Sequence, residues 1–596
     1  NPYGALWDGQ VFDDHRVLDS FWDGVTEVEA RRTDFGWTME LKIPWTTFRF
    51  EESAASQAWG LNILRRVRRI NEVSYWAPLE PFENLPKVSR AGTLTGLTGA
   101  HQGRNVRLKP YTLWSTTSGL DSGSSGRTLD VGGELKYVLN SALTLDATYQ
   151  TDFSHVEADE VQLNLSRFPL FFPERREFFI ENSGIFDFGD GTQRAYRSSV
   201  SAHDFTLFHT RRVGLTEAGT PVPILAGTRL SGRMGRFEIG ALAMRTRAAA
   251  DDRQPENFGV VRIRHRFTGD SNIGLLVTHR NMAVDGAEPG YNRAYGIDAD
   301  VLVADHLLLT SYAAVVEAPG TSPSVLDRAA MRLSAAWRDR FWNTALLFRQ
   351  FGGDFDPGLG FVRRKAMRHY YGTMGVHPRP ERFGLQEINP YVEMDYFTNL
   401  ESILETRRAA AGLALRFDDG SQSSLTYQNL FERLFESFAI PDSEIMIESG
   451  AYRTEEVTFS YRMSPARLLS GSVDFSRGGY FGGTRTAYGL GAAWRPSPYV
   501  FLEAAIERNE VMISRDRLLA DVGRVRLRVT PTNKFLTSAF VQFNGLTDEL
   551  GSNIRVRFIH APLSDLYLVY SESRDTHGRM DTNRTFAIKL TRLFQF

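Results

Sequence analysis

The sequence predicts an all-β protein. Its main body would be a large transmembrane antiparallel β-barrel of about 24–26 strands, preceded by part of a periplasmic β-sandwich. Three observations lead to this prediction. No run in the 596 residues approaches the roughly 18 apolar residues of a membrane-spanning helix. From about residue 105 to the end, stretches of about ten residues alternate between apolar and polar side chains. The breaks between these stretches alternate between short and long, which is typical of bacterial outer-membrane barrels.

The composition excludes several other classes of protein. The formal net charge of −2 creates no field that would favour nucleic acid. The absence of cysteine excludes a disulfide framework, a thiolate metal site and cysteine catalysis. No G-x-S-x-G or H-E-x-x-H motif occurs, so the sequence does not indicate an enzyme. An outer-membrane hydrolase stays open as the third-ranked function, because some barrels are lipases or proteases.

The predicted strands show which side chains would face the lumen. From 469 to 476, Leu469, Val473 and Phe475 share one face, and serines and an aspartate occupy the other. Three further strands alternate apolar residues with arginines, which would point inward. These basic rows are Arg262, Arg264 and Arg266; Arg524, Arg526 and Arg528; and Arg555 and Arg557. Rings of arginine favour anions in a pore. An ion-paired wall is the alternative, since Glu503 and Glu507 would point inward too.

The breaks predict the orientation of the barrel. The short ones include 268–270, 463–465, 496–498 and 530–533, and the long ones include 282–291, 351–366, 438–450 and 573–583. Short turns are periplasmic in outer-membrane barrels. The last strand would end in Phe594 and Phe596, which resembles the signal read by the bacterial barrel-assembly machinery. An ordinary edge strand at the end of the chain is the alternative.

A count of strands leaves one long segment inside the barrel. Strands are expected near 104–118, 127–139, 142–153 and 158–166, followed by about 22 strands from residue 203 onward. If the stretch 203–213 is a strand running outward, residues 155–202 must first bring the chain to the periplasmic side. A barrel of this size cannot be filled by its own side chains, so its lumen holds water or a plug.

The stretch RFPLFFPERREFFIENSGIFDFG (167–189) is the predicted plug or constriction. It combines prolines and glycines with many phenylalanines, so it is neither an alternating strand nor a good helix. Exposed to water, its aromatic surface would promote aggregation. The residues expected to pack in the lumen or across the periplasmic mouth are Phe168, Phe171, Phe172, Arg175, Arg176, Phe178 and Phe179. The stretch would either gate a pore or act as a brace for a wide barrel.

The acidic stretch before it is a candidate for calcium. Asp152, Glu157 and Asp159 cluster within eight residues, and carboxylates are the ligands that this cation prefers. The spacing differs from that of an EF-hand loop. A solvated loop, or one paired with Arg175 and Arg176, is therefore the favoured alternative. No other cofactor is expected.

The stretch TDFSHVEADEVQLNLSRFPLFFPERREFFIENSGIFDFG (151–189) strongly resembles the hallmark segment of an uncharacterised bacterial outer-membrane family. Its members carry a carbohydrate-binding-family-9-like domain followed by a barrel described as domain of unknown function 5916. GWTMELKIPWTTFRF and WGLNILRRVRRINEVSYWAPL resemble the second half of that N-terminal domain. The resemblance implies a sandwich part at 1–95 in the periplasm. It also implies an outer-membrane barrel at 96–596, with 155–202 folded into the lumen or the periplasmic mouth.

The resemblance also suggests carbohydrate. Trp37, Trp59 and Trp76 are candidates for stacking on sugar rings, and the alternative is that they form the core of the sandwich. Half a sandwich would expose a sheet edge and apolar core. We therefore expect the first half to be cleaved off, left out of this sequence or supplied by a separate chain.

Together these features predict a gated or plugged outer-membrane pore for a solute, with a saccharide as one candidate. The alternative is a structural scaffold or interaction subunit of a larger outer-membrane complex. The expected partners are outer-membrane lipid, the barrel-assembly machinery, carbohydrate and other envelope proteins, and nucleic acid is not among them.

Overall fold

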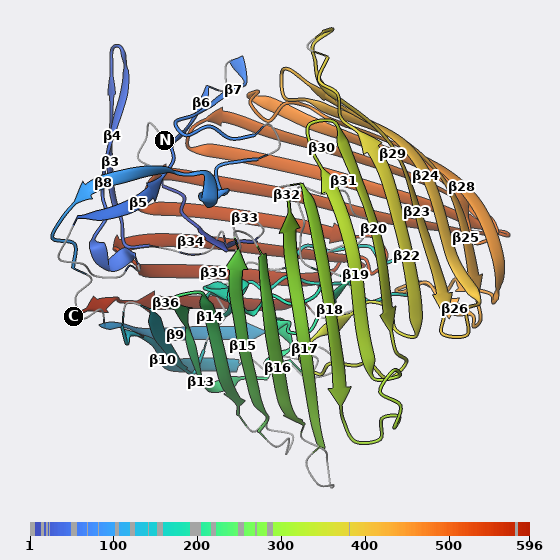
Figure 1. Cartoon of the computed structure of the whole chain (residues 1–596), viewed down its shortest axis with the longest axis horizontal. Helices are drawn as coiled ribbons and strands as arrows, with labels where there is room; N and C mark the ends of the chain where they lie inside the picture. The colour runs from blue at the N-terminus through green and yellow to red at the C-terminus, as the bar shows by residue number, and fades with distance from the viewer. Residues whose placement is uncertain are drawn as a thin grey trace.

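The computed structural model shows a closed antiparallel barrel with a smaller N-terminal part at one end (Figure 1). The structure describes residues 6–12, 17–19, 22, 24–48, 50, 56–67, 70–80, 83–101, 106–119, 126–140, 142–151, 159–190, 204–215, 222–247, 255–268, 271–282, 290–304, 306–380, 382–577 and 582–596. No helix in these ranges is long and apolar enough to cross a membrane.

The barrel contains 24 strands, because the last two segments are parts of one strand that closes the ring against β9. The first half comprises β9 (Val106–Ser118), β10 (Gly126–Val138), β11 (Leu143–Tyr149), β13 (Ile224–Met234), β14 (Phe237–Thr246), β15 (Asn257–Thr268), β16 (Ser271–Met282), β17 (Gly290–Val303), β18 (Leu307–Glu317), β19 (Ala329–Arg338), β20 (Trp342–Phe351) and β22 (Met367–Val376). The second half comprises β23 (Leu385–Asn399), β24 (Leu404–Phe417), β25 (Gln422–Leu434), β28 (Gly450–Arg462), β29 (Leu469–Tyr480), β30 (Gly483–Ser497), β31 (Val500–Ile513), β32 (Asp516–Thr532), β33 (Phe535–Asn544), β34 (Glu549–Ala561), β35 (Ser564–Asp575), and β36 (Asn583–Thr591) with β37 (Phe594–Gln595).

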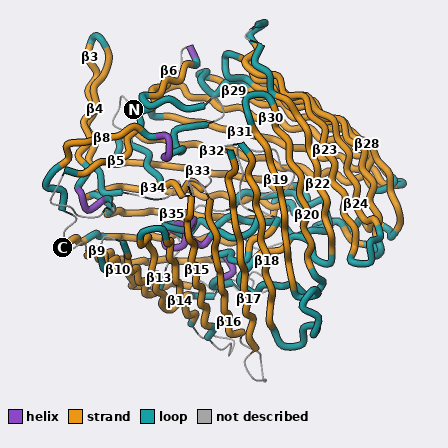
Figure 2. The backbone as a smooth tube through the Cα atoms, viewed as in Figure 1, coloured by secondary structure: helices purple, strands orange, loops and turns teal. Residues whose placement is uncertain are grey.

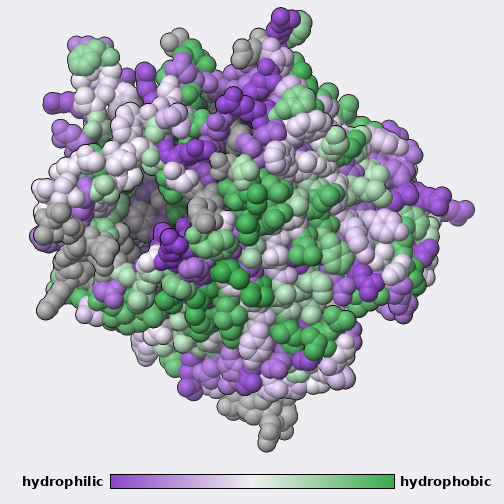
Figure 3. All heavy atoms as spheres, viewed as in Figure 1, coloured by the Kyte–Doolittle hydropathy of each residue, from purple (hydrophilic) through white to green (hydrophobic). Residues whose placement is uncertain are grey.

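The two faces of the wall follow the alternation in the sequence. Leu333 and Leu346 expose 64% and 67% of their surface outward, whereas Arg332 and Arg349 on the same strands are buried on the inside. Apolar residues gather across the middle of the strands in view and hydrophilic residues gather at their ends (Figure 3). Most strands are ten residues or longer, enough to cross the hydrocarbon core when tilted. The fold prediction is therefore confirmed, with 24 strands, and the barrel is of the outer-membrane type.

The connections are less regular than predicted. One end of the barrel, here called the short-turn end, has brief links such as 235–236, 339–341 and 498–499. The opposite, long-loop end carries 318–328, 352–366 and 435–449, but also tight turns at 481–482 and 514–515. Phe481 and Gly482 both have positive φ, which fits the right-handed twist of a two-residue hairpin. Loop length therefore separates the two ends in part of the barrel and not from β29 to β34.

Two predicted strands are wrong. The described residues 159–166 form no strand, and the stretch 203–213 contains only the two-residue β12 (Phe205–Thr206), which pairs with β21 (Phe361–Val362). β11 pairs directly with β13, so the chain between them leaves and rejoins the wall at the long-loop end. The prediction that a strand at 203–213 starts from the periplasmic side is therefore wrong too. Polar partners away from the sheet replace strand pairing here, as when the Val161 amide donates to Gln542.

The N-terminal part lies at the short-turn end (Figure 1). Its described residues form four two-stranded sheets. These are β1 (Gln10–Phe12) with β2 (Val17–Asp19), β3 (Glu27–Thr33) with β4 (Gly36–Lys42), β5 (Gln57–Leu61) with β8 (Gly92–Leu97), and β6 (Leu64–Val67) with β7 (Glu72–Tyr75).

Contacts at several points of the rim attach this part to the barrel. Asn71 donates to the Asp418 carbonyl, Glu80 pairs with Arg340 at 3.1 Å, and Gln595 donates to the Thr46 hydroxyl. The first two involve short turns of the barrel and the third involves its last strand. The N-terminal part is therefore connected to separate points of the short-turn mouth.

Candidate functional site

Residues 159–190 and 204–215, here called the inner segment, pack against the inward face of the barrel wall. Figure 2 shows their loops and short helical turns within the ring of strands. The segment contributes Phe178, Phe186, Phe188, Phe205 and Leu207 to the largest buried apolar cluster. The wall contributes residues of β14 to β20, among them Leu242, Phe258, Leu276, Tyr312 and Phe351. Gly240 and Gly296 supply room, because a Cβ at either position would collide with rings of this segment.

The acidic start of the inner segment is held by arginines. Asp159 pairs with Arg211 and lies 3.2 Å from the Arg175 Nε. Glu160 accepts from Arg526 at 2.7 Å and from Arg524 at 3.0 Å, across the lumen on β32. The Arg526 hydrogen bond keeps the pKa of Glu160 below its usual value.

Of the three residues predicted to bind calcium, only Asp159 lies within the described residues. Asp152 and Glu157 lie outside the described residues, and Asp159 is used in ion pairs. No group of three metal-binding side chains occurs within the part of the chain that the structure describes.

The aromatic stretch that follows mixes rings with guanidinium groups. Arg364 lies over the rings of Phe168 and Phe397 at 5.3 and 4.6 Å. Phe172 lies beneath Arg211 at 5.5 Å, and Phe171 packs on the His209 ring at 4.6 Å. Such cation–π and ring contacts let aromatic surface coexist with charge in a partly wet lumen.

Arg176 ties two parts of the inner segment together. It forms a bidentate pair with Glu174 and donates to the carbonyls of Thr210 and Val213. Burial opposes the charge of Glu174, but the Arg176 hydrogen bonds and charge outweigh it and lower the pKa of that carboxyl. Burial lowers the pKa of the neighbouring His209 to about 4.

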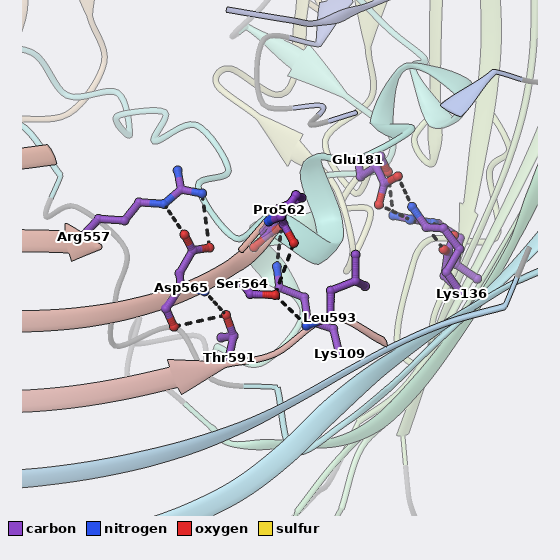
Figure 4. Close-up of polar contacts among 12 residues, drawn as sticks. Lys109, Lys136, Glu181, Arg557, Pro562, Ser564, Asp565, Thr591 and Leu593 are labelled. Atoms are coloured by element: carbon purple, nitrogen blue, oxygen red, sulfur yellow. Dashed lines mark hydrogen bonds and ion pairs between the residues drawn. The ribbon is translucent and has the colours of Figure 1, made fainter. Parts of the chain in front are cut away.

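The helical turn α1 (Glu177–Ile180) sits near the short-turn end, beside the seam where the barrel closes. Glu177 pairs with Lys109 at 3.0 Å, and Glu181 pairs with Lys136 (Figure 4). Arg229 donates to the carbonyls of Phe178 and Glu181 and pairs with Asp146 at 2.8 Å.

Figure 4 also shows the wall beside this turn. Arg557 pairs with Asp565 at 2.8 Å, and the Leu593 amide donates to the Ser564 hydroxyl at 2.9 Å. These bonds fix the break between β36 and β37, so the end of the chain and α1 meet at the same mouth.

A second charged cluster holds the centre of the inner segment. The Asp190 carboxylate is fully buried and accepts from Arg332 at 3.0 Å, Arg349 at 2.5 Å and the Tyr312 hydroxyl at 3.3 Å. Asp204 pairs with Arg349 at 3.0 Å. Both carboxylates belong to the inner segment and all three of the Asp190 partners belong to the wall, so this cluster is a latch between the two.

The inner segment packs unequally against the wall. β14 and β20 each bury five residues, at every second position. β28 and β30 bury none, and their inward side chains stay half-exposed. The segment also reaches that side of the barrel, where the Tyr480 hydroxyl donates to the Leu165 carbonyl at 2.6 Å and the Val161 amide donates to Gln542 at 2.9 Å.

A pocket of about 430 Å³ opens on that lumen toward the long-loop end, and we call it the lumen pocket. Its wall comes mainly from β20, β22, β23, β24 and β25, and the inner segment contributes two side chains. It is lined by Phe168, Asp204, Arg349, Phe351, Arg363, Arg364, Met367, His369, Glu393, Asp395, Phe397, Thr406, Arg408, Leu430 and Glu432.

The charged groups of the lumen pocket are paired with one another or with a neighbour. Arg408 contacts Glu393 at 2.7 Å and Asp395 at 3.1 Å. The Arg349 Nε donates to His369 Nδ1 at 3.0 Å, which leaves Nε2 to donate to Asp395 at 2.9 Å. His369 therefore has the neutral tautomer and lies stacked on Phe397 at 3.8 Å.

Arginines of the predicted basic rows pair with carboxylates. These pairs are Arg262 with Asp298, Arg264 and Arg266 with Glu238, Arg524 and Arg526 with Glu160, and Arg557 with Asp565. Arg528 lies 5.5 Å from the Phe501 ring, and Arg555 points inward on β34.

The tryptophans proposed for sugar stacking lie apart from one another. Trp59 packs against Trp45 at 5.4 Å and Phe50 at 5.1 Å in a small aromatic core. Trp37 and Trp76 are exposed. At the other end of the chain, Phe594 and Phe596 are also exposed.

The lumen pocket was not predicted from the sequence, although part of the residue pattern that indicates it is present there. The alternation of side chains along β23 places Glu393, Asp395 and Phe397 on its inward face. The same alternation places Thr406 and Arg408 on the inward face of β24. Opposite charges at inward positions of neighbouring strands would have indicated the paired wall. The contribution of Phe168 and Asp204 depends on the path of the inner segment, which parity does not give.

Comparisons with known proteins leave the activity of the chain open. A family model described as "Domain of unknown function (DUF5916)" matches residues 105–246, which hold β9 to β14 and the inner segment. No curated protein matches the sequence.

Several solved structures resemble the chain at low identity. OpdQ of Pseudomonas aeruginosa is 7% identical, with 83% of this chain and 98% of that chain covered and a TM-score of 0.27. The ferric enterobactin receptor PfeA is 11% identical, with 82% and 81% covered and a TM-score of 0.39. The FrpB iron transporter of Neisseria meningitidis is 8% identical, with 82% and 81% covered and a TM-score of 0.36. These values are too low to transfer an activity.

Proposed function

We propose that the chain is a gated outer-membrane passage for a solute, in which the inner segment is the plug. The observation that carries the proposal is the unequal packing of this segment, which buries the β14–β20 wall and leaves β28 and β30 half-exposed. A brace that only filled the barrel would have no reason to leave one wall wet.

The attachments of the inner segment support a movable plug. Its contacts to the wall across the lumen include ion pairs, such as Glu160 with Arg524 and Arg526. Ion pairs that water can reach contribute little net stability, so they can open and re-form at small cost. The apolar cluster around Phe188 holds the remainder to one side.

The orientation follows from the loops. We assign the short-turn end to the periplasm, because short turns are periplasmic in barrels of this type. The N-terminal part would then lie in the periplasm and the lumen pocket would open toward the cell exterior.

The proposal is tested by locking the plug in a chain that has no native cysteine. Thr206 of the inner segment and Phe361 are opposed partners in the antiparallel pair β12–β21, and the Cα atoms of such partners lie about 4.5–5.5 Å apart, close enough for a disulfide between Thr206→Cys and Phe361→Cys. Single-channel conductance in a planar bilayer is measured for this pair, oxidised and reduced, and for a deletion of 167–189. Thr206→Cys alone is the matched control.

We expect the deletion to raise conductance and the oxidised pair to abolish openings that return on reduction. A folded deletion variant that conducts like wild type would overturn the plug. A disulfide that leaves opening unchanged would limit motion to parts of the plug away from Thr206.

A second candidate, a scaffold or interaction subunit, is favoured by one feature of the N-terminal part. The β3–β4 hairpin projects from the molecule, and its exposed face carries Trp37, Met39 and Leu41 (Figure 1). An amphipathic two-stranded sheet of this kind suits a partner that adds a β-strand. Complete absence of conductance in all the variants above, with the barrels folded, would favour this function.

A further inference from the structure

We infer that the lumen pocket binds a neutral, polyhydroxylated solute such as a sugar unit, and this inference rests on the proposed passage. The pocket lies between the inner segment and the inward face of β20 to β25, where a solute passing the segment would meet it. Its volume of about 430 Å³ falls within the usual range for small-molecule sites.

The charge balance of the pocket argues against a charged ligand. Its lining contains four arginines, four carboxylates and a neutral histidine, so its formal charge is zero. An anion would have to take an arginine from a carboxylate that already holds it, and a cation would have to do the reverse. Either exchange leaves a buried charge without its partner, which is strongly unfavourable.

A neutral polyol needs no such exchange. Each hydroxyl both donates and accepts, and paired charged groups still have hydrogen-bonding capacity left. Glu393 accepts from Arg408 and from the Tyr371 hydroxyl, and its carboxylate has further acceptor positions. Asp395 and Arg408 repeat this arrangement on neighbouring strands, so donors and acceptors are interleaved along the pocket wall.

The remaining lining is apolar and suits the C–H surface of a sugar ring. Phe168, Phe351, Met367, Phe397 and Leu430 line the same pocket as the charged groups. Small-molecule sites commonly combine apolar walls with a few polar groups that orient the ligand.

The pocket also connects the ligand to the plug. Phe168 and Asp204 belong to the inner segment, and the other lining residues belong to the wall or to the loop after β21. A solute bound here touches both sides of the proposed gate. Its occupancy would therefore change the equilibrium of the plug if the two states of the plug present different pockets.

The experiment measures binding directly, without conductance. Saturation-transfer NMR on the full chain in detergent is recorded with glucose, galactose, mannose and maltose as neutral probes. Glucuronate and glucosamine serve as anionic and cationic probes. The pocket variants are Glu393→Gln and Phe397→Leu, and Asp521→Asn, in an exposed ion pair elsewhere on the barrel, is the matched control.

We expect at least one neutral sugar to bind, with glucuronate and glucosamine weaker by about tenfold or more. Each pocket variant should weaken that sugar by about tenfold, and the control should not change it. The inference is overturned if no neutral sugar binds the folded chain, or if a charged probe binds more tightly. The conductance of the locked plug is independent of these results, so a failure of this inference and a failure of the proposed function are distinguishable.

Discussion

Removal of the Asp190 carboxylate should release the inner segment from the wall while the barrel stays folded. In the structure this carboxylate is fully buried and accepts from Arg332, Arg349 and Tyr312. Asp190→Ala leaves two guanidinium groups buried without this partner whenever the segment is docked. When the segment undocks, water reaches both arginines, so the substitution raises the free energy of the docked state alone.

The size of the effect follows from the burial of the cluster. Loss of one partner from a buried ion pair costs about 3–5 kcal/mol. Every 1.4 kcal/mol changes an equilibrium tenfold, so the docked population should fall roughly a hundred- to several-thousand-fold relative to the undocked one. Asp190→Asn keeps the shape and one acceptor, so its effect should be smaller.

Hydrogen–deuterium exchange of the full chain in detergent measures this equilibrium. We expect faster exchange in peptides covering 176–190 and unchanged protection in β20, which reports on the barrel itself. Asp521→Asn is the control, because its pair with Arg508 is exposed and such pairs contribute at most about 1 kcal/mol. Unchanged exchange at 176–190 in a folded Asp190→Ala protein would refute the latch.

Three further outcomes are expected. Gly296→Val should displace the inner segment, because a Cβ there lies 2.5 Å from the Phe188 ring. The same hydrogen–deuterium exchange assay measures this displacement. Gly259→Ala is the control and should have no effect, because its Cβ has its nearest neighbour at 3.9 Å. Lowering the pH from 7 to 5 should loosen 204–215, because an unfolded histidine takes up a proton near pH 6.5, whereas the docked His209 does so only near pH 4. The stability that His209 contributes above pH 6.5 is therefore lost on acidification. His209→Phe should flatten this pH dependence. Deletion of Phe596 should reduce the fraction of heat-modifiable, folded barrel in outer-membrane fractions if the aromatic end is an assembly signal, and normal assembly would exclude that role.

The sequence predicted the wall far better than the contents of the barrel. Alternation alone places Val261 and Ile263 outward and Arg262 inward, because side chains of a strand alternate between its two faces. The same rule suggested a strand at 158–166, where Val161 and Leu165 alternate with polar residues. There the backbone instead finds partners such as Gln542, which belongs to a strand far away in the sequence. Periodicity describes a local repeat and carries no information about such distant partners.

The path of the inner segment shows the same limit. If 203–213 were a strand running outward, the chain would have to cross from one end of the barrel to the other between residues 153 and 203. β11 and β13 are neighbours instead, so the chain leaves the wall and rejoins it at the same end. The predicted range of 24–26 strands still includes the observed 24, because the two false strands account for the difference from the upper value.

The two kinds of attachment suggest where the proposed gate would open first. Around Phe188 the inner segment is fixed by a continuous apolar cluster, which must be exposed to water before that part can move. Near Glu160 it is fixed by charge pairs with Arg524 and Arg526, whose side chains remain partly exposed. Water and salt can replace those pairs at much smaller cost. Motion should therefore begin near Glu160, while 178–188 stays in place against β14–β20. If the passage widens beside β32, only part of the plug has to move. This fits a segment that is held by ion pairs at one part and by apolar packing at another.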